Sequence, residues 1–347
     1  MDEAKRARHF ASDNNSGICP EVWAALAEAN TGHVSGYGDD PWNEKAKQLV
    51  RDLFETDCEV FFVYNGTAAN SLAMASICDS YQSVIALDYS HVVTDECNAP
   101  GFFAPGVKMQ PVSGVNGKLL PDVIDRAARS RRDVHASMSR VVSVTQATEL
   151  GTVYTPDELA GISKTARDAG LYVHMDGARF ANAVASLGVK PREISWEMGV
   201  DVLSLGGTKN GLAGADAVVF FNENLPQNFL YRCKQAGQLA SKMRFLAAQW
   251  IGLLQDGAWL RNAKNANGAA ALLEAQLRGV AGVRILYPRQ ANAVFVDMPR
   301  RVQDGLHERG WHFYTDVGPG GARLMCSWDS TADDVAAFVR DVVDLSK

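Results

Sequence analysis

Residues 172–179 read YVHMDGAR, a hydrophobic run that ends in an aspartate, a glycine and an arginine. Such a run is typical of a strand buried on both faces, as in a parallel sheet covered by helices. A helix is predicted just before it, because Thr155-Pro156-Asp157-Glu158 is a capping box with proline at the first helical position. Another β-branched run lies at 141–145. Strand, helix and strand together predict a crossover unit of an α/β fold.

The same alternation extends in both directions from this unit. The other strands expected in this region are 60–63, 83–87, 202–205 and 217–221. After about Leu246 the pattern changes to a helical segment at 268–278, two strands at 283–286 and 293–296, and a last helix from Ala332. We therefore expect an N-terminal arm (1–20), a large domain (21–245) and a smaller C-terminal α+β domain (246–347).

Composition excludes several classes of protein. The 347 residues are 47% hydrophobic and 21% charged, which is too much material for a small binding module. The net charge of -6, without long blocks of like charge, argues against binding to nucleic acid or a membrane surface. The six cysteines show no metal-site spacing, so we expect reduced thiols and no metal. No signal peptide or apolar run of roughly 18 residues is evident, which predicts a cytoplasmic protein.

A turn at the end of the strand 60–63 has the features of a phosphate site. Gly66 and Thr67 begin a helix of small residues, and a helix N-terminus offers free N–H groups and a positive dipole. Gly66 lets an anion approach the backbone, and Thr67 adds a hydroxyl donor. The alternative is that Thr67 only caps its own helix. The turn has neither a Walker motif nor a dinucleotide fingerprint.

Two further polar groups follow neighbouring strands. Asp176 and Arg179 lie at the carboxyl end of the strand at 172–175, where ligands bind in parallel sheets. Lys209 lies among glycines at the end of the next strand, a position that a solvated surface charge explains poorly. Chemistry with pyridoxal phosphate requires a lysine, an acidic partner for the pyridine nitrogen and a phosphate site. The sequence contains all three and predicts an enzyme that uses this cofactor.

Four motifs together resemble the low-specificity L-threonine aldolases, which are pyridoxal-phosphate enzymes of fold type I, the aspartate-aminotransferase fold. The motifs lie at 37–40, 66–70, 174–179 and 207–211. The resemblance runs from Ser12 to about Trp328 and is closest to the bacterial branch that includes phenylserine aldolases. It implies a mainly parallel seven-stranded sheet flanked by helices in the large domain. It also implies a homotetramer with active sites at dimer interfaces.

The implied activity is that of a carbon–carbon lyase. The substrates would be L-threonine, L-allo-threonine and bulkier L-β-hydroxy-α-amino acids such as phenylserine, and the products glycine and an aldehyde. A β-eliminating lyase or an aminotransferase on the same fold remains the alternative. Either would share Asp176 and Lys209 but would release ammonia and pyruvate, or a keto acid.

The resemblance also implies roles for individual residues at the cofactor. Lys209 matches the lysine that forms a Schiff base with the cofactor, and Asp176 the partner of the pyridine nitrogen. Gly66 and Thr67 match the phosphate turn. His91 falls where the family stacks an imidazole on the cofactor ring, although the residues alone favour a loop histidine at the end of the strand 83–87.

Substrate contacts are implied for a second group of residues. Arg179 matches the residue near the ring hydroxyl and the substrate carboxylate, and Ser12 and Arg323 the remaining carboxylate contacts. His135 and Asp95 match positions near the β-hydroxyl. The alternatives are that His135 belongs to a polar helix end and that Asp95 satisfies local backbone donors. The base that removes the β-hydroxyl proton is left open between the two histidines His91 and His135, or a water that either holds.

Basic and aromatic residues that reach a neighbouring subunit are a last expectation. Lys234 is expected to support the phosphate, with Arg244 as the alternative. Tyr37 is expected to reach a neighbour's site, or else to be a buried tyrosine in a glycine-rich turn.

Overall fold

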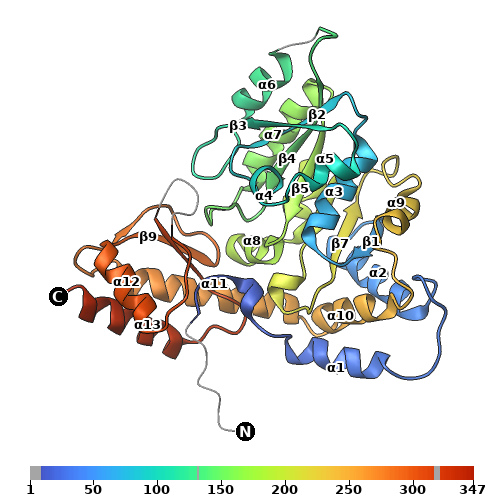
Figure 1. Ribbon diagram of the computed structural model, residues 1–347. Coiled ribbons are helices and arrows are strands. Elements are labelled where there is room, and N and C mark those ends of the chain that lie inside the picture. Colours follow the sequence, from blue (N-terminus) through green and yellow to red (C-terminus); the bar gives the residue numbers. More distant parts are fainter. Residues whose placement is uncertain (1–8, 131–132, 316–320) are drawn as a thin grey trace.

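A mainly parallel, seven-stranded sheet forms the centre of the molecule (Figure 1). The computed structural model describes residues 9–130, 133–315 and 321–347, so residues 1–8 of the predicted arm lie outside it. The strand order is β1-β7-β6-β5-β4-β2-β3. The strands are β1 (Glu59–Val63), β2 (Gln82–Leu87), β3 (Lys108–Val112), β4 (Met138–Thr145), β5 (Tyr172–Gly177), β6 (Val202–Leu205) and β7 (Asp216–Phe220). The five strands from β3 to β6 pair in parallel and β7 is antiparallel to both neighbours, which confirms the predicted fold class.

Helices cover both faces of this sheet. They are α1 (Pro20–Ala29), α2 (Pro41–Phe54), α3 (Gly66–Ile77), α4 (His91–Thr94), α5 (Ala99–Phe103), α6 (Pro121–Arg129), α7 (Pro156–Asp168), α8 (Phe180–Leu187), α9 (Phe229–Gln235) and α10 (Arg244–Gln255). The predicted capping box begins α7, since Thr155 and Glu158 exchange side-chain-to-backbone hydrogen bonds. The crossover unit β4-α7-β5 is therefore present as predicted.

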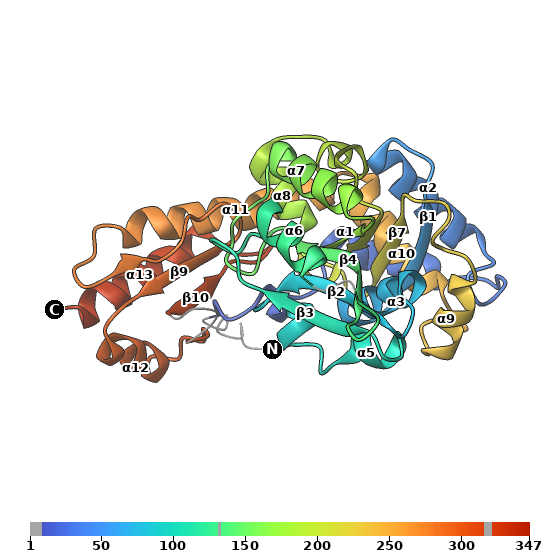
Figure 2. The same cartoon turned by 90° about the horizontal axis from the view of Figure 1, so that it is seen from above.

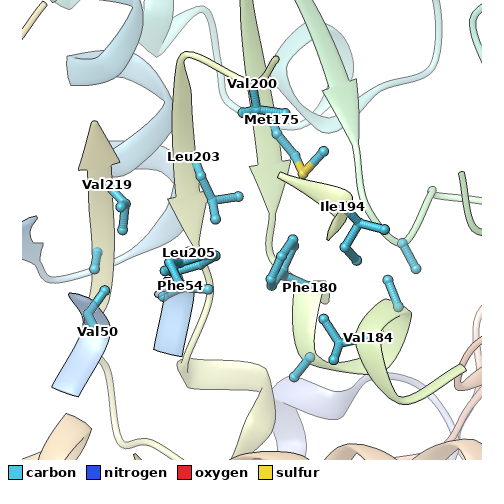
Figure 3. Close-up of a cluster of buried hydrophobic side chains, with 14 of the residues drawn as sticks. Val50, Phe54, Met175, Phe180, Val184, Ile194, Val200, Leu203, Leu205 and Val219 are labelled. Carbon is cyan, nitrogen blue, oxygen red and sulfur yellow. The ribbon is translucent and has the colours of Figure 1, made fainter. Parts of the chain in front are cut away.

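The two faces bury different side chains, because neighbouring residues of a strand point in opposite directions. Met175 and Leu203 belong to a hydrophobic cluster that includes Phe54 of α2 and Phe180 of α8 (Figure 3). The opposite face packs against α3. Asp176 follows Met175 and therefore faces α3, on the side where the phosphate turn begins that helix.

A smaller antiparallel sheet lies to one side of the large one (Figure 2). Its strands are β8 (Arg284–Ile285), β9 (Ala293–Asp297) and β10 (Ala322–Met325), and its helices are α12 (Arg300–Glu308) and α13 (Ala332–Leu345). The N-terminal segment joins this part, since Phe10 N–H donates to His312 O at 2.8 Å and Phe10 O accepts from Met325 N at 2.8 Å. The start of the chain is thereby tied to its C-terminal part.

The helix α11 (Ala258–Leu277) connects the two parts without interruption (Figures 1 and 2). Its first half contributes Trp259 and Ala263 to the core of the large sheet. Its second half contributes Leu273 and Leu277 to the core of the small one. Because α10 packs on α1 and α2, we propose that the boundary between the domains falls inside α11. Among the described residues, no helix is both long enough and apolar enough to span a membrane.

Candidate active site

The residues predicted for cofactor chemistry gather at one edge of the large sheet. Gly66 follows β1, His91 follows β2, Asp176 ends β5 and Lys209 follows β6. These four strands point the same way, so their carboxyl ends meet at the same edge. Topology alone therefore assembles the site that the motifs predicted.

The carboxylate of Asp176 is buried and held from two sides. The residue is 5% exposed, and its Oδ1 accepts from Ala178 N–H at 2.9 Å. Its Oδ2 accepts from Asn70 Nδ2 at 3.0 Å. A carboxylate fixed in this way suits a protonated ring nitrogen, because little reorientation is needed to stabilise the charge.

The turn at the start of α3 keeps its first N–H groups available. Asn65, not Thr67, caps the helix, since Asn65 Oδ1 accepts from Ala68 N–H at 2.9 Å. The alternative in which Thr67 caps its own helix is therefore wrong. The N–H groups of Gly66 and Thr67 and the Thr67 hydroxyl have no hydrogen-bond partner among the described residues. The turn fits a phosphate group.

Lys209 lies on a short helical turn (Thr208–Asn210) that two glycines bring close to its neighbours. A Cβ on Gly206 would lie 2.6 Å from the backbone of Ala178, and one on Gly207 would lie 2.9 Å from Ala215 O. Glycine is thus required for the end of β6 to approach the loop after Asp176.

The lysine amine is tuned by its surroundings. Burial and then the charge of Arg179 lower the pKa of Lys209, while the carboxylates of Asp13, Asp176 and Asp216 act in the opposite direction. A desolvated lysine of lowered pKa is a better nucleophile toward a carbonyl carbon. Together with the fixed carboxylate and the open helix terminus, Lys209 completes a set of groups that fits pyridoxal phosphate.

Asp216 anchors the turn that carries this lysine, and the motifs did not reveal it. Its Oδ1 accepts from Gly207 N–H at 2.8 Å, Thr208 N–H at 3.1 Å and Thr208 Oγ1 at 3.0 Å. Its Oδ2 lies 3.5 Å from the place of a Cβ on Gly66. One side chain therefore connects the lysine turn with the phosphate turn.

Arg179 has an acidic partner that the sequence did not predict. Its Nε and Nη2 donate to Asp13 Oδ2 at 2.7 Å and Oδ1 at 2.8 Å, and Asp13 also accepts from Asn292 Nδ2 at 3.0 Å. Burial alone would raise the pKa of Asp13, but Arg179 beside it brings that pKa below its usual value. One edge of the Arg179 guanidinium is thus already occupied. Ser12 precedes this aspartate, and its Oγ accepts from Asn14 N–H at 3.1 Å.

Arg323 keeps a free donor beside this group. Its Nη2 donates to Ala11 O at 3.1 Å, whereas its Nε is buried and has no partner among the described residues. Burial and the charge of Arg179 lower the pKa of Arg323 to about 10, and Asp95 is close enough to act on it in the opposite direction. A buried guanidinium with an unused N–H fits a carboxylate ligand.

His91 is held at the start of α4 by two acidic side chains, of which the sequence predicted neither. The ring nitrogen Nδ1 of His91 lies 2.8 Å from Glu96 Oε1, and the backbone N–H of His91 donates to Glu149 Oε1 at 3.1 Å. Asp95, one residue before Glu96, accepts from Thr94 Oγ1 at 2.6 Å. The hydrogen bond with Glu96 raises the pKa of His91, against the effect of burial.

The remaining predicted residues are not brought into this group within one chain; His135, Lys234 and Tyr37 are exposed and Arg244 is half-buried. His135 precedes β4, at the amino edge of the sheet, and its N–H donates to Asp133 Oδ1 at 3.0 Å. Lys234 Nζ lies 4.4 Å from the centre of the Tyr37 ring, and Tyr37 is 54% exposed. The interpretation of Tyr37 as a buried residue is therefore wrong. Arg244 donates to Thr31 O and Gly32 O at 3.3 Å.

Fold and site together define a fold-type I pyridoxal-phosphate enzyme, and comparisons with known proteins agree. Residues 9–300 match the beta-eliminating lyase family. A "Low specificity L-threonine aldolase" of Pseudomonas aeruginosa is 57% identical over 96% of this chain and 97% of its own, and one of a Pseudomonas species is 54% identical over 97% of both. The chain belongs to the beta-eliminating lyase family and, within it, to the low-specificity L-threonine aldolases. It is accordingly a carbon–carbon lyase that depends on pyridoxal phosphate.

Solved structures of known proteins share the fold of this chain. The threonine aldolase of Leishmania major superimposes with a TM-score of 0.92 at 29% identity, covering 98% of this chain and 99% of that one. An aspartate aminotransferase of Thermus thermophilus superimposes with a TM-score of 0.74 at 15% identity, covering 97% and 96%. The second likeness shows the shared fold alone.

Proposed function

We propose that this enzyme cleaves L-threonine, L-allo-threonine and bulkier L-β-hydroxy-α-amino acids such as phenylserine to glycine and an aldehyde. The relatives named above are low-specificity L-threonine aldolases, which supports this substrate class. The observation that carries the proposal is the buried Nε of Arg323, which lies near Arg179 and Asp13 and has no hydrogen-bond partner among the described residues. An amino-acid carboxylate is the ligand that this nitrogen lacks.

Each residue then has a task that its surroundings support. Arg323 binds the substrate carboxylate, with Ser12 and the free edge of Arg179 beside it. Asp176 stabilises positive charge on a ring nitrogen, since Asn70 and Ala178 fix its orientation. Pyridoxal phosphate, when bound through Lys209 and the phosphate turn, supplies the electron sink that breaking a Cα–Cβ bond requires.

The proton of the β-hydroxyl needs a base, and His91 is the residue of this chain that we assign to it. Its imidazole lies at the carboxyl edge of the sheet, and its Nε2 has no hydrogen-bond partner among the described residues. Asp95 follows in the same short segment. His135 lies at the opposite edge of the sheet, so its predicted role requires a second subunit.

We also propose that the chain assembles as a homotetramer, as the resemblance implies, and acts in the cytoplasm. The exposure of Tyr37, Lys234 and His135 supports the first of these proposals, because all three are available to a neighbouring subunit. Tyr37 and Lys234 already contact each other, so they would reach the neighbouring site together, with Lys234 or Arg244 at the phosphate.

The activity is tested by measuring aldehyde and glycine released from L-threonine, L-allo-threonine and phenylserine, with the D-enantiomers as controls. Equimolar glycine and aldehyde from the L-substrates are expected. Ammonia with a keto acid as the product, or no aldehyde from any L-substrate, would overturn the proposal. Light scattering of the holoenzyme tests the oligomeric state independently.

A further inference from the structure

A buried glutamate, Glu96, lies behind the imidazole of His91. Glu96 is 3% exposed, and its Oε1 lies 2.8 Å from His91 Nδ1 and 2.8 Å from Asn70 Nδ2. Asn70 Nδ2 also donates to Asp176 Oδ2 at 3.0 Å. An amide nitrogen carries two hydrogens, so both bonds of Asn70 can be made at once. A continuous chain of hydrogen bonds therefore runs from His91 to Asp176.

This arrangement is unfavourable for stability taken alone. Glu96 Oε2 and Asn70 Oδ1 are buried and have no hydrogen-bond partner among the described residues. A buried polar atom without a hydrogen-bond partner lowers stability, because it loses its contacts with water and gains none. One ring nitrogen of His91 and one carboxylate oxygen from each of Glu96 and Asp176 also lie within 4.8 Å of one another. Two carboxylates are therefore close together. Such a group is better explained by a role in the site than by packing.

We propose that Glu96 is a positioning residue that holds His91 in the tautomer with the proton on Nδ1, so that Nε2 serves as the base for the β-hydroxyl proton. Burial raises the pKa of Glu96, and the hydrogen bonds from His91 and Asn70 act in the opposite direction. When ionised, this carboxylate only accepts hydrogen bonds, so the nitrogen facing it must carry the hydrogen. The other ring nitrogen then keeps its lone pair. This inference rests on the proposed function for the identity of the proton, but the tautomer itself does not depend on it.

Three charged groups near His91, namely Glu96, Asp176 and Lys209, affect its pKa. The hydrogen bond with Glu96 is the largest influence and raises the pKa of His91, while burial lowers it. Asp176 acts in the same direction as Glu96, and Lys209 in the opposite direction. Glu149 faces the backbone N–H of the same residue. Removing the charge of Glu96 should therefore lower the pKa of His91.

The variant Glu96→Gln tests the proposal, because it keeps the shape of the side chain and removes its charge. The acid limb of the pH profile of kcat/KM should move to lower pH by about one unit, and kcat should fall about 10- to 100-fold. Glu274→Gln is the matched control, since Glu274 is also a buried glutamate but pairs with Arg278 and Arg289. Its profile should not move. An unshifted acid limb in Glu96→Gln would overturn the proposal.

Nitrogen-15 NMR of the histidine rings gives a readout that does not depend on turnover. In holoenzyme and in cofactor-free protein, the resonances of His91, assigned with His91→Asn, should show a protonated Nδ1 and an unprotonated Nε2 above the pKa. Glu96→Gln should give a mixture of tautomers. A proton on Nε2 in the wild-type protein would refute the positioning role even if the enzyme cleaves threonine. The expected tautomer without any aldehyde release would leave the positioning intact and refute the aldolase function.

Discussion

Asp13 and Arg179 form a two-pronged ion pair, with Nε–Oδ2 at 2.7 Å and Nη2–Oδ1 at 2.8 Å, across 166 positions of sequence. The pair joins the N-terminal segment to the loop after β5, directly beside Lys209. The charge of Arg179 lowers the pKa of Lys209, and the carboxylate of Asp13 acts in the opposite direction. Asp13 therefore partly offsets the effect of Arg179 on the lysine. The pair occupies one edge of the Arg179 guanidinium, so under the proposed function Arg323 is the main contact of the substrate carboxylate, with the free edge of Arg179 beside it.

Replacing Asp13 should destabilise the protein. Asp13→Asn leaves the buried Arg179 without its anionic partner, a change that typically lowers the free energy of unfolding by about 3–5 kcal/mol. Urea unfolding of the holoenzyme measures this change in the free energy of unfolding. Asp304→Asn is the control, because its pair with Arg300 is exposed and should contribute at most about 1 kcal/mol. Equal effects of the two variants would contradict the assignment.

The same ion pair predicts a pH dependence. Because the pKa of Asp13 is lowered in the folded protein, the pair stabilises at pH values above the unfolded pKa of about 4, and this stabilisation is lost as the pH falls through the folded pKa. The difference in unfolding free energy between wild type and Asp13→Asn should therefore be full at pH 7 and shrink below pH 4. A difference that stays constant down to pH 2 would speak against it.

Asp216 should control how firmly the lysine turn holds the cofactor. Asp216→Ala removes three hydrogen bonds to Gly207 and Thr208, and we expect the dissociation constant of pyridoxal phosphate to rise about tenfold, a change of about 1.4 kcal/mol. Asp216→Asn retains an acceptor oxygen and should lie closer to wild type. Absorbance titration of cofactor-free protein measures both, and the idea fails if the alanine variant binds as wild type does.

Arg323 should determine substrate affinity. Losing a charge-assisted hydrogen bond is worth about 1.5–3 kcal/mol, so Arg323→Ala should raise KM for L-threonine about 10- to 100-fold with a smaller change in kcat. Arg284→Ala is the control, because Arg284 pairs with Asp297 on an exposed strand. A KM that does not change in Arg323→Ala would exclude the carboxylate contact.

Lys209→Ala should abolish both turnover and the absorbance band of the bound cofactor in the near-ultraviolet to visible range. Lys164→Ala, which changes an exposed lysine paired with Asp168, should leave both intact. Full activity in the Lys209 variant would show that another residue binds the cofactor.

The sequence predicted the strands that are buried and rich in β-branched residues. It did not predict β3, because Lys108–Val112 has no continuous hydrophobic run and contains Pro111, which an edge strand tolerates. It also began the long helix at 268 when it begins at Ala258. Short or weakly patterned elements are specified by tertiary contacts that local periodicity does not contain.

The residues of the candidate site also fall into those that the sequence predicted and those that it did not. Lys209, Asp176 and Gly66 could be predicted because each lies at or just after the carboxyl end of a strand, and these ends converge at one edge. Asp13, Glu96 and Asp216 could not, because each acts on a partner that only the folded chain brings near. An aspartate that begins a helical turn has no local signal that it will meet an arginine 166 positions away. The residues that we expect to bind ligands were visible in the sequence, whereas the residues that contact and orient them were not.

The uninterrupted α11 limits how this enzyme could be made smaller. A gene ending near residue 245 would remove the buried Trp250, Leu253 and Trp259 from the large sheet and expose the surface they cover. A fragment containing only the small sheet would lack Phe10, whose ring packs on Trp311 and Phe338. Minimised or split versions are therefore expected to aggregate, and surface loops are the places to insert tags or partner sequences.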